Sequence, residues 1–319
     1  MNASAHFSRR HALGFLGASG VAALAAACSS GDPLANDGKG EGSGEPGAAK
    51  SGGSGPIVVG SQAYYSNEII AELFAQVLEK EGLKVERQYQ IGQREVYMKE
   101  LESGKVDVLP EYTGNLLQYY DDKAEAAEPA AIFDELAGVL PEGLTALPFA
   151  EATDQDSYTT TKKFADDNSL KAIGDLKNVN EDLKVAGNSE LETRPFGPKG
   201  VKEAYGVDLN VVPVEDSGGP LTVKALTDGK AQLANIYTAS PAVKENNLVA
   251  LEDPEALILP QNVTPLVTAK VDDAARKAIA KVTEKLTTSE LIELNAKSVN
   301  EQAKSADIAK EWLATQKLV

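Results

Sequence analysis

Histidine and cysteine are almost absent from this chain of 319 residues. Its two histidines, His6 and His11, and its single cysteine, Cys28, all lie within the first 28 positions. The rest of the chain therefore cannot form a disulfide. It also lacks the residues of Ser-His-Asp and Cys-His catalytic sites, and of nearly every zinc or copper site. We expect no metal, no cofactor and no enzyme chemistry of these kinds.

Basic residues are also fewer than acidic residues in this chain. The chain has 31 Lys and Arg against 48 Asp and Glu, which gives a formal net charge of −17. This balance argues against nucleic acid or an anionic membrane surface as the main partner, although a local site of either sign stays open. The hydrophobic content of 42% and the charged content of 25% are typical of a folded, soluble protein.

Hydrophobic runs long enough to span a bilayer are missing as well. The weakly apolar run from Ala12 to Ala27 has sixteen residues, which is too few for a membrane-spanning helix. It follows Ser8-Arg9-Arg10, as in a twin-arginine signal. Because Ala12 stands where that signal usually has Phe, an ordinary Sec signal stays open. Leu24-Ala25-Ala26-Ala27-Cys28 resembles a lipobox. We therefore expect residues 1–27 to be a removed signal peptide and Cys28 to be the acylated mature N-terminus.

Residues 28–56 have the composition of a flexible linker. They contain nine glycines, with Ser, Pro, Ala and scattered charge, and almost no large apolar side chain. Such a segment cannot bury enough surface to offset its ordering entropy, and its ends would lie roughly 30 Å apart. The sequence thus predicts an exported domain that a lipid on a long tether holds at the cell membrane.

From residue 57 onward the pattern alternates between strands and helices. Short apolar runs predict strands, and apolar residues at helical spacing predict helices between them. The expected strands are 57–59, 85–91 and 106–109, and the expected helices are 69–78 and 94–102. This order predicts a parallel sheet with helices on both faces, and a ligand site beyond the carboxyl ends of its strands.

A second, smaller α/β set begins near Tyr158. Its expected strands are 183–187, 209–214 and 232–236, and its expected helices are 198–205 and 221–226. One or two strands follow, at 248–251 and 265–268, and residues 272–317 are expected to be wholly helical. Two α/β units of this size predict two lobes with a cleft between them.

Five short motifs follow the linker in order. They are Val59-Gly60-Ser61-Gln62-Ala63-Tyr64, Leu109-Pro110-Glu111-Tyr112-Thr113-Gly114-Asn115, Thr193-Arg194-Pro195-Phe196-Gly197, Gly218-Gly219-Pro220-Leu221-Thr222 and Pro260-Gln261-Asn262-Val263-Thr264-Pro265. With them the chain resembles the substrate-binding proteins of osmoprotectant ABC importers, the OpuC, ProX and OsmF group that takes up glycine betaine, choline and carnitine. The resemblance implies a type II periplasmic-binding-protein fold, with residues 57–153 and 240–319 in the first lobe and residues 154–239 in the second.

The resemblance also implies a role in transport rather than catalysis. A monomeric, lipid-anchored protein would capture a quaternary ammonium osmoprotectant in its cleft. It would then deliver this ligand to the permease subunits of an ABC importer. No cofactor and no nucleic acid would take part.

A quaternary ammonium group predicts an aromatic site. Its charge lies behind methyl groups and it has no N–H to donate, so the faces of several aromatic rings surround it better than a carboxylate alone. Tyrosine suits this purpose, because its hydroxyl can stay hydrogen-bonded at the cleft wall. By resemblance Tyr112, Tyr158 and Tyr237 match cage positions, with Tyr64 as a fourth candidate. The other six tyrosines are interpreted as packing residues or left unassigned.

A zwitterionic ligand also needs a partner for its carboxylate. The planar guanidinium of Arg194 suits bidentate binding of a carboxylate, and the resemblance assigns it this role; a salt bridge between the lobes is the alternative. By the same resemblance Asn115 could donate its amide and Asp156 lies near the ammonium. Gln62 stands where relatives commonly have Lys, and Gln261 stands where some have a further cage Tyr.

Other classes of function stay open at this point. Carboxylate pairs such as Asp154 with Asp156 could in principle do acid–base work, but an acidic chain has many such pairs by chance. An envelope lipoprotein that binds another protein is a second alternative. A third keeps the fold but changes the ligand to a related compound, such as ergothioneine or dimethylsulfoniopropionate.

Replacing Cys28 with alanine removes the thiol that lipid attachment requires. We expect the Cys28→Ala variant to leave the membrane fraction. Its ligand affinity should be unchanged, because the long linker separates the lipid from the cleft. Cell fractionation with immunoblotting tests the first part, and calorimetry on the purified variant tests the second. Retention in the membrane fraction would contradict the lipid anchor.

Overall fold

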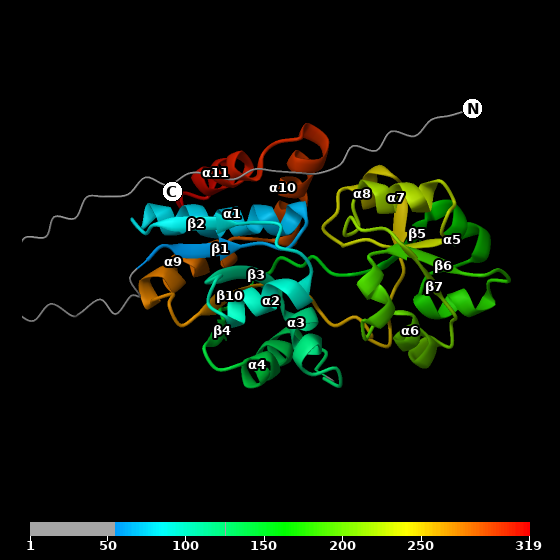
Figure 1. The fold of residues 1–319 in the computed structure, drawn as a ribbon. Helices are drawn as coiled ribbons and strands as arrows, with labels where there is room; N and C mark the ends of the chain where they lie inside the picture. Colours follow the sequence, from blue (N-terminus) through cyan, green and yellow to red (C-terminus); the bar gives the residue numbers. More distant parts are fainter. Residues whose placement is uncertain (1–54, 125) are drawn as a thin grey trace, which may run out of the picture. The chain divides into compact units, whose positions relative to one another are not determined.

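The computed structural model describes residues 55–124 and 126–319 (Figure 1). The expected signal peptide, Cys28 and all but the last two residues of the expected linker lie outside the described residues. None of the helices in the described ranges is long and apolar enough to cross a lipid bilayer.

The first sheet has five strands in the order β2-β1-β3-β10-β4. Its parallel part consists of β1 (Ile57–Gly60), β2 (Val85–Gln88) and β3 (Val108–Tyr112), so the predicted parallel order of these three strands is confirmed. β10 (Val263–Thr268) lies between β3 and β4 (Leu144–Ala146) and runs antiparallel to both. The sheet is therefore mixed, because the chain re-enters it in the opposite direction after completing the second sheet.

Helices cover both faces of this sheet, as predicted. Successive side chains of a strand point to opposite faces, and along β3 Val108 joins one hydrophobic core while Leu109 joins the other. On the first face lie α1 (Tyr65–Lys80), α9 (Asp273–Thr283), α10 (Thr288–Glu301) and α11 (Ser305–Thr315). On the second lie α2 (Arg94–Glu102), α3 (Thr113–Tyr120) and α4 (Pro129–Val139).

The C-terminal segment, which was expected to be wholly helical over 272–317, consists of three separate helices joined by short turns. Asp272 caps α9 by accepting a hydrogen bond from the Ala275 amide at 2.9 Å. A capping box of Thr287 and Glu290 starts α10 afresh, and α10 ends at Gln302, whose φ of 55° is left-handed. Such caps satisfy the free backbone groups at each helix end. The chain can therefore turn twice and pack all three helices beside α1.

The second sheet also has five strands, in the order β7-β6-β8-β5-β9. β6 (Lys184–Gly187), β7 (Asn210–Pro213) and β8 (Leu233–Asn235) are parallel, and β5 (Tyr158–Thr161) runs antiparallel to β8. The helices around it are α5 (Lys162–Asn168), η1 (Ile173–Asn178), η2 (Ser189–Thr193), α6 (Pro198–Tyr205), α7 (Pro220–Thr227) and α8 (Ala242–Glu245).

β9 (Leu248–Ala250) differs from the expected arrangement. It falls in the range 240–319 that was expected to form part of the first lobe, yet it pairs antiparallel with β5 at the edge of the second sheet. This pairing provides hydrogen-bond partners for the backbone groups of β5 that face away from β8, and it leaves β9 as the edge strand. The chain therefore returns to the first sheet only with β10.

Three segments of the chain cross between the two sheets. The first, 153–157, and the second, 236–240, lie side by side, because the Thr238 amide donates to the Gln155 carbonyl at 2.9 Å and the Ile236 amide donates to the Ser157 carbonyl at 3.3 Å. The third crossing runs from β9 to β10, residues 251–262, and Asn262 forms an isolated bridge with Thr153 of the first. The crossings are thus joined to one another at the base of the space between the sheets.

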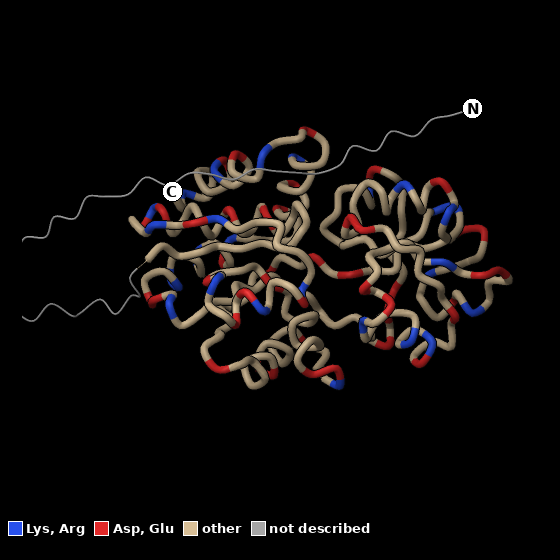
Figure 2. Tube along the Cα trace, in the orientation of Figure 1, with Lys and Arg blue, Asp and Glu red and all other residues tan. Residues whose placement is uncertain are grey.

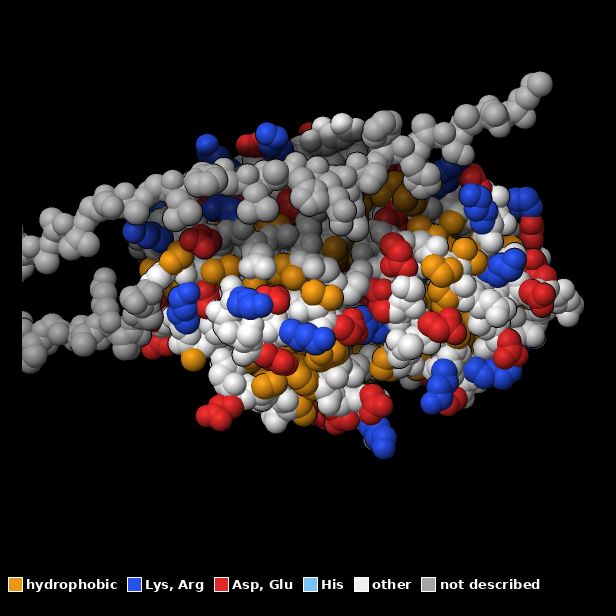
Figure 3. Space-filling model, viewed as in Figure 1, with side chains coloured by type: hydrophobic (Ala, Val, Ile, Leu, Met, Phe, Trp, Pro, Cys, Tyr) orange, Lys and Arg blue, Asp and Glu red, His pale blue; other side chains and the backbone are white. Residues whose placement is uncertain are grey.

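The outer surface carries mixed charge. Acidic and basic residues are interspersed along the helices around both sheets (Figure 2). On the face shown in Figure 3, hydrophobic side chains lie singly or in small groups between charged ones. Scattered exposed apolar residues are ordinary for a folded protein.

Candidate ligand-binding site

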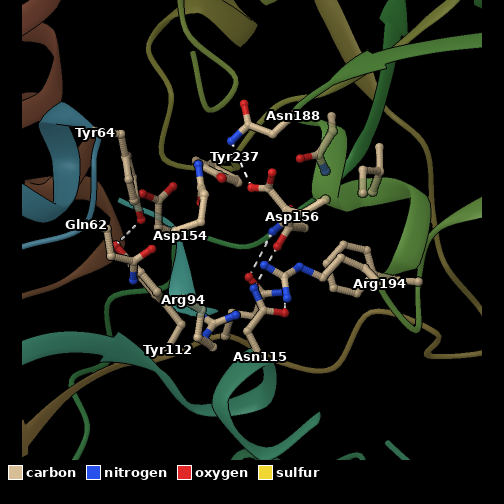
Figure 4. Close-up of a pocket in the computed structure, with 16 residues that line it drawn as sticks. Gln62, Tyr64, Arg94, Tyr112, Asn115, Asp154, Asp156, Asn188, Arg194 and Tyr237 are labelled. Atoms are coloured by element: carbon tan, nitrogen blue, oxygen red, sulfur yellow. Dashed lines mark hydrogen bonds between the residues drawn. The ribbon is translucent and has the colours of Figure 1, made fainter. Parts of the chain in front are cut away.

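One pocket lies where the crossings meet the carboxyl ends of β1 and β3, and side chains from both sheets line it (Figure 4). Eight of the nine expected binding residues line this pocket; they are Gln62, Tyr64, Tyr112, Asn115, Asp156, Arg194, Tyr237 and Gln261. The sequence did not assign eight further lining residues, which are Gln93, Arg94, Asp154, Asn188, Glu190, Leu191, Phe196 and Asn235. The pocket therefore brings most of the expected residues together, along with further polar groups.

Three tyrosines form an aromatic side of the pocket. Tyr64 precedes α1, Tyr112 ends β3, and Tyr237 lies in the second crossing. The rings of Tyr64 and Tyr237 have centroids 5.2 Å apart and are tilted by 54°. The hydroxyl of Tyr64 donates to that of Tyr112 at 2.5 Å. Burial raises the pKa of all three phenols, so they are uncharged at neutral pH.

Tyr158 does not line the pocket, which corrects the expectation that it belongs to the cage. Its ring is fully buried in the core of the second sheet, and its hydroxyl donates to the Phe196 carbonyl at 2.7 Å. On a strand the choice of face alternates at every residue, and at position 158 the side chain points into the core. Tyr158 therefore supports the loop of Phe196, which does line the pocket.

A buried carboxylate, Asp154, faces the aromatic side. It accepts hydrogen bonds from the Ser66 hydroxyl at 2.9 Å and from the Ala239 amide at 3.0 Å. Burial raises the pKa of Asp154 to about 7, and the nearby charge of Asp156 adds to the rise. Asp154 thus joins α1 to both of the first two crossings and titrates near neutral pH.

Three of the predicted residues form one hydrogen-bonded ring. The Asn115 amide donates to Asp156 at 2.8 Å, the Gln261 amide donates to Asn115 at 3.0 Å, and the Asp156 backbone N–H donates to Gln261 at 3.0 Å. These residues come from α3, the first crossing and the third crossing. Each side chain is therefore held in one orientation where the three segments meet.

Arg94 is a pocket residue that the sequence did not reveal. Its Nε and Nη2 both donate to Glu111 at 2.9 Å, and the Tyr97 hydroxyl donates to the same carboxylate at 2.5 Å. All three residues are buried. Glu111 lies inside one of the five sequence motifs, and a buried carboxylate in a strand needs a cationic partner. That requirement is the signal that could have pointed to Arg94.

Arg194 forms a salt bridge across the space between the sheets. Its Nη1 donates to Glu95 Oε1 at 2.6 Å, and its Nη2 lies 3.5 Å from Glu95 Oε2. Glu95 belongs to α2, beside the first sheet, while Arg194 follows η2, beside the second. The structure thus shows the salt bridge that the sequence left as the alternative role for Arg194, and the same side chain lines the pocket.

Two amide nitrogens of the pocket have no partner. Among the described residues, Gln62 Nε2 and Asn235 Nδ2 are buried and donate no hydrogen bond to the protein. Unmade hydrogen bonds of buried groups cost free energy. Gln62 follows β1 and Asn235 ends β8, so each sheet supplies one N–H group to which a ligand could bind.

Comparison with known proteins defines the class. The chain matches, over residues 55–315, the family described as the substrate-binding domain of ABC-type glycine betaine transport systems. It belongs to this family and is therefore a substrate-binding protein of ABC transport, not a member of an enzyme family.

Individual relatives agree with this assignment. The glycine betaine-binding protein YehZ of Escherichia coli (strain K12) is 25% identical over 221 residues, in an alignment that covers 66% of this chain and 71% of YehZ. The structure of a glycine betaine/carnitine/choline ABC transporter protein superimposes with a TM-score of 0.67 at 20% identity, covering 82% of this chain and 99% of that one. Apo YehZ from E. coli gives a TM-score of 0.61 at 23% identity, covering 83% and 99%. The predicted two-lobed type II periplasmic-binding-protein fold is confirmed.

Replacing Glu111 with glutamine tests the buried ion pair behind the pocket. The Glu111→Gln variant leaves the Arg94 guanidinium buried without a counter-charge, so the free energy of unfolding should fall by about 3–5 kcal/mol. Urea unfolding followed by circular dichroism measures the change. As a control, Glu203→Gln removes a carboxylate that lies 3.9 Å from Lys199 on the surface, and it should change stability little. Equal stability of both variants would contradict this account.

Proposed function

We propose that this protein captures a quaternary ammonium osmoprotectant, such as glycine betaine, choline or carnitine, and delivers it to the permease subunits of an ABC importer. The single observation that carries the proposal is the gathering of Tyr64, Tyr112 and Tyr237 on one side of a pocket that also contains the buried carboxylate Asp154. The name of the E. coli relative, a glycine betaine-binding protein, supports the same ligand class.

The chemistry of the ligand explains why these groups suit it. A trimethylammonium group cannot donate a hydrogen bond, so it is held by ring faces and by negative charge rather than by hydrogen-bond acceptors. Each ring contact contributes roughly 0.5–2 kcal/mol as it becomes desolvated. A nearby carboxylate adds a Coulomb attraction that is stronger in a buried site than in water. Three rings and a carboxylate therefore provide both parts of the interaction.

The remaining lining residues have supporting roles in this proposal. Asn115, Asp156 and Gln261 form a fixed polar wall, and Gln62 offers its unpaired amide to an oxygen of the ligand. Arg194 is the candidate partner for a ligand carboxylate, but it must exchange Glu95 for that carboxylate.

The proposal extends to the place and manner of action. We infer that the protein is exported and held at the outer face of the cell membrane by a lipid on Cys28, and that it works as a monomer. Residues 57–153 with the segment from the third crossing onward would move as one lobe, and the middle of the chain as the other. The ligand would be bound and released without chemical change.

Removing a ring should weaken binding. Tyr112→Ala and Tyr237→Ala should each cost roughly 0.5–2 kcal/mol, up to about thirtyfold in affinity for glycine betaine and for choline. The Phe variants should recover most of this loss, because the ring face remains. Titration calorimetry measures the affinities, and NMR of the recovered ligand checks that it is unchanged.

A matched control for the ring deletions is Tyr119→Ala. Tyr119 is partly exposed, packs edge-to-face with Tyr120 and does not line the pocket, so this variant should bind as the wild type does. If both pocket variants bind the two ligands as tightly as the control does, the aromatic assignment is wrong.

Ligand binding should also draw the lobes together. Because side chains from both sheets line the pocket, a ligand that contacts both stabilises the conformation in which they are closest. Small-angle scattering should therefore give a smaller radius of gyration with saturating ligand than without it. The Tyr237→Ala variant at the same ligand concentration, below its own saturation, should show a smaller change. An identical radius with and without bound ligand would argue against closure.

A further inference from the structure

Both cationic side chains of the pocket are already neutralised. Arg94 is held by two hydrogen bonds to Glu111, and Arg194 is held by Glu95. The charge of a guanidinium that binds a carboxylate in this way is balanced by the charge of that carboxylate. Neither arginine therefore presents an uncompensated positive charge to a ligand.

The carboxylates of the pocket are in the opposite situation. Asp154, Asp156 and Glu190 all line it, and the hydrogen bonds they accept come from neutral donors. These donors are the Ser66 hydroxyl and Ala239 amide for Asp154, the Asn115 amide for Asp156, and the Asn188 amide for Glu190. Within the described part of the chain, none of the three carboxylates has a Lys or Arg nitrogen within salt-bridge distance. The pocket consequently carries an excess of negative charge.

We infer that this pocket selects a quaternary ammonium ligand with a net positive charge and no carboxylate, of the choline type, over a zwitterion such as glycine betaine. The inference rests on the proposed function and narrows its ligand class. The cationic head places one positive charge among the three carboxylates and so reduces the excess of negative charge. The hydroxyl of such a ligand can accept from the unpaired amides Gln62 Nε2 and Asn235 Nδ2, which are neutral and leave the charge balance as it is.

A zwitterion gains less from the same site. Its carboxylate must enter a volume that already contains Asp154, Asp156 and Glu190, and like charges at close range repel strongly when they are partly desolvated. It must also displace Glu95 from Arg194, which breaks an existing ion pair to form a new one. Discrimination therefore comes from repulsion as well as attraction.

The titration of Asp154 gives this selectivity a pH dependence. Burial raises the pKa of Asp154 to about 7 in the free protein. The titratable groups around it are Asp156 of the same crossing, Tyr64 and Tyr65 at the start of α1, Tyr112 of β3 and Tyr237 of the second crossing. The pKa of each of these phenols is raised, so they stay neutral between pH 6 and 8. A bound cation favours ionised Asp154, and affinity for it must fall as the pH drops through about 7.

The experiment is titration calorimetry of the wild-type protein with choline and with glycine betaine at pH 8 and pH 6. Choline should bind more tightly than glycine betaine at pH 8. Its affinity should fall about tenfold at pH 6, because the fraction of ionised Asp154 falls by about that factor. The affinity for glycine betaine should change much less over the same range.

Three variants separate charge from structure. Asp156→Asn and Asp154→Asn should each lower choline affinity by at least about tenfold, with a smaller effect on glycine betaine, and Asp154→Asn should also abolish the pH dependence. Glu95→Gln releases Arg194 and should raise the affinity for glycine betaine relative to choline. The matched control is Glu192→Gln, which removes an exposed carboxylate outside the pocket and should change neither affinity. Thermal unfolding of each variant shows that it is folded.

The outcomes distinguish this inference from the proposed function. If neither compound binds, the proposed function fails. If glycine betaine binds as tightly as choline or more tightly, or if the folded Asp156→Asn variant keeps its choline affinity, the ligand class inferred here is wrong while the proposed function stands.

Discussion

The buried carboxylate of Asp154 is the interaction on which the site depends. It accepts hydrogen bonds from Ser66 at the start of α1 and from Ala239 in the second crossing, while its own backbone belongs to the first crossing. A buried carboxylate without such partners would be strongly unfavourable. These contacts therefore fix where the crossings lie against α1, and with them the positions of Tyr64 and Tyr237.

Much of the fold could be predicted from the sequence because its signals are local. The strands expected at 57–59 and 183–187 differ from the observed strands by one residue each, and the helix expected at 198–205 has the observed bounds. The mixed direction of the first sheet could not be predicted, since the pairing of Tyr112 with Val263 joins segments about 150 positions apart. Periodicity describes one segment at a time and carries no information on such partners.

Part of the site could also be predicted from the sequence. The resemblance assigned eight residues that line the pocket, but it could not tell that Tyr158 faces the core, because a shift of one residue along a strand reverses the face. Nor could it show that Arg194 is bound to Glu95 or that Arg94 approaches the pocket from α2. A motif identifies which groups are near a ligand, whereas their net charge depends on pairings that only the folded chain reveals.

The insertion of the second sheet between β4 and β10 has a consequence for how the protein folds. β10 fills the place between β3 and β4, so the first sheet stays incomplete until residues 158–250 have been synthesised. Contacts of such long sequence separation slow folding, and domains generally fold as units during synthesis. The second sheet can thus form early as a self-contained body, whereas Tyr112 and Gln261 come together only near the end. Ligand-binding competence would then be among the last properties that the nascent protein acquires.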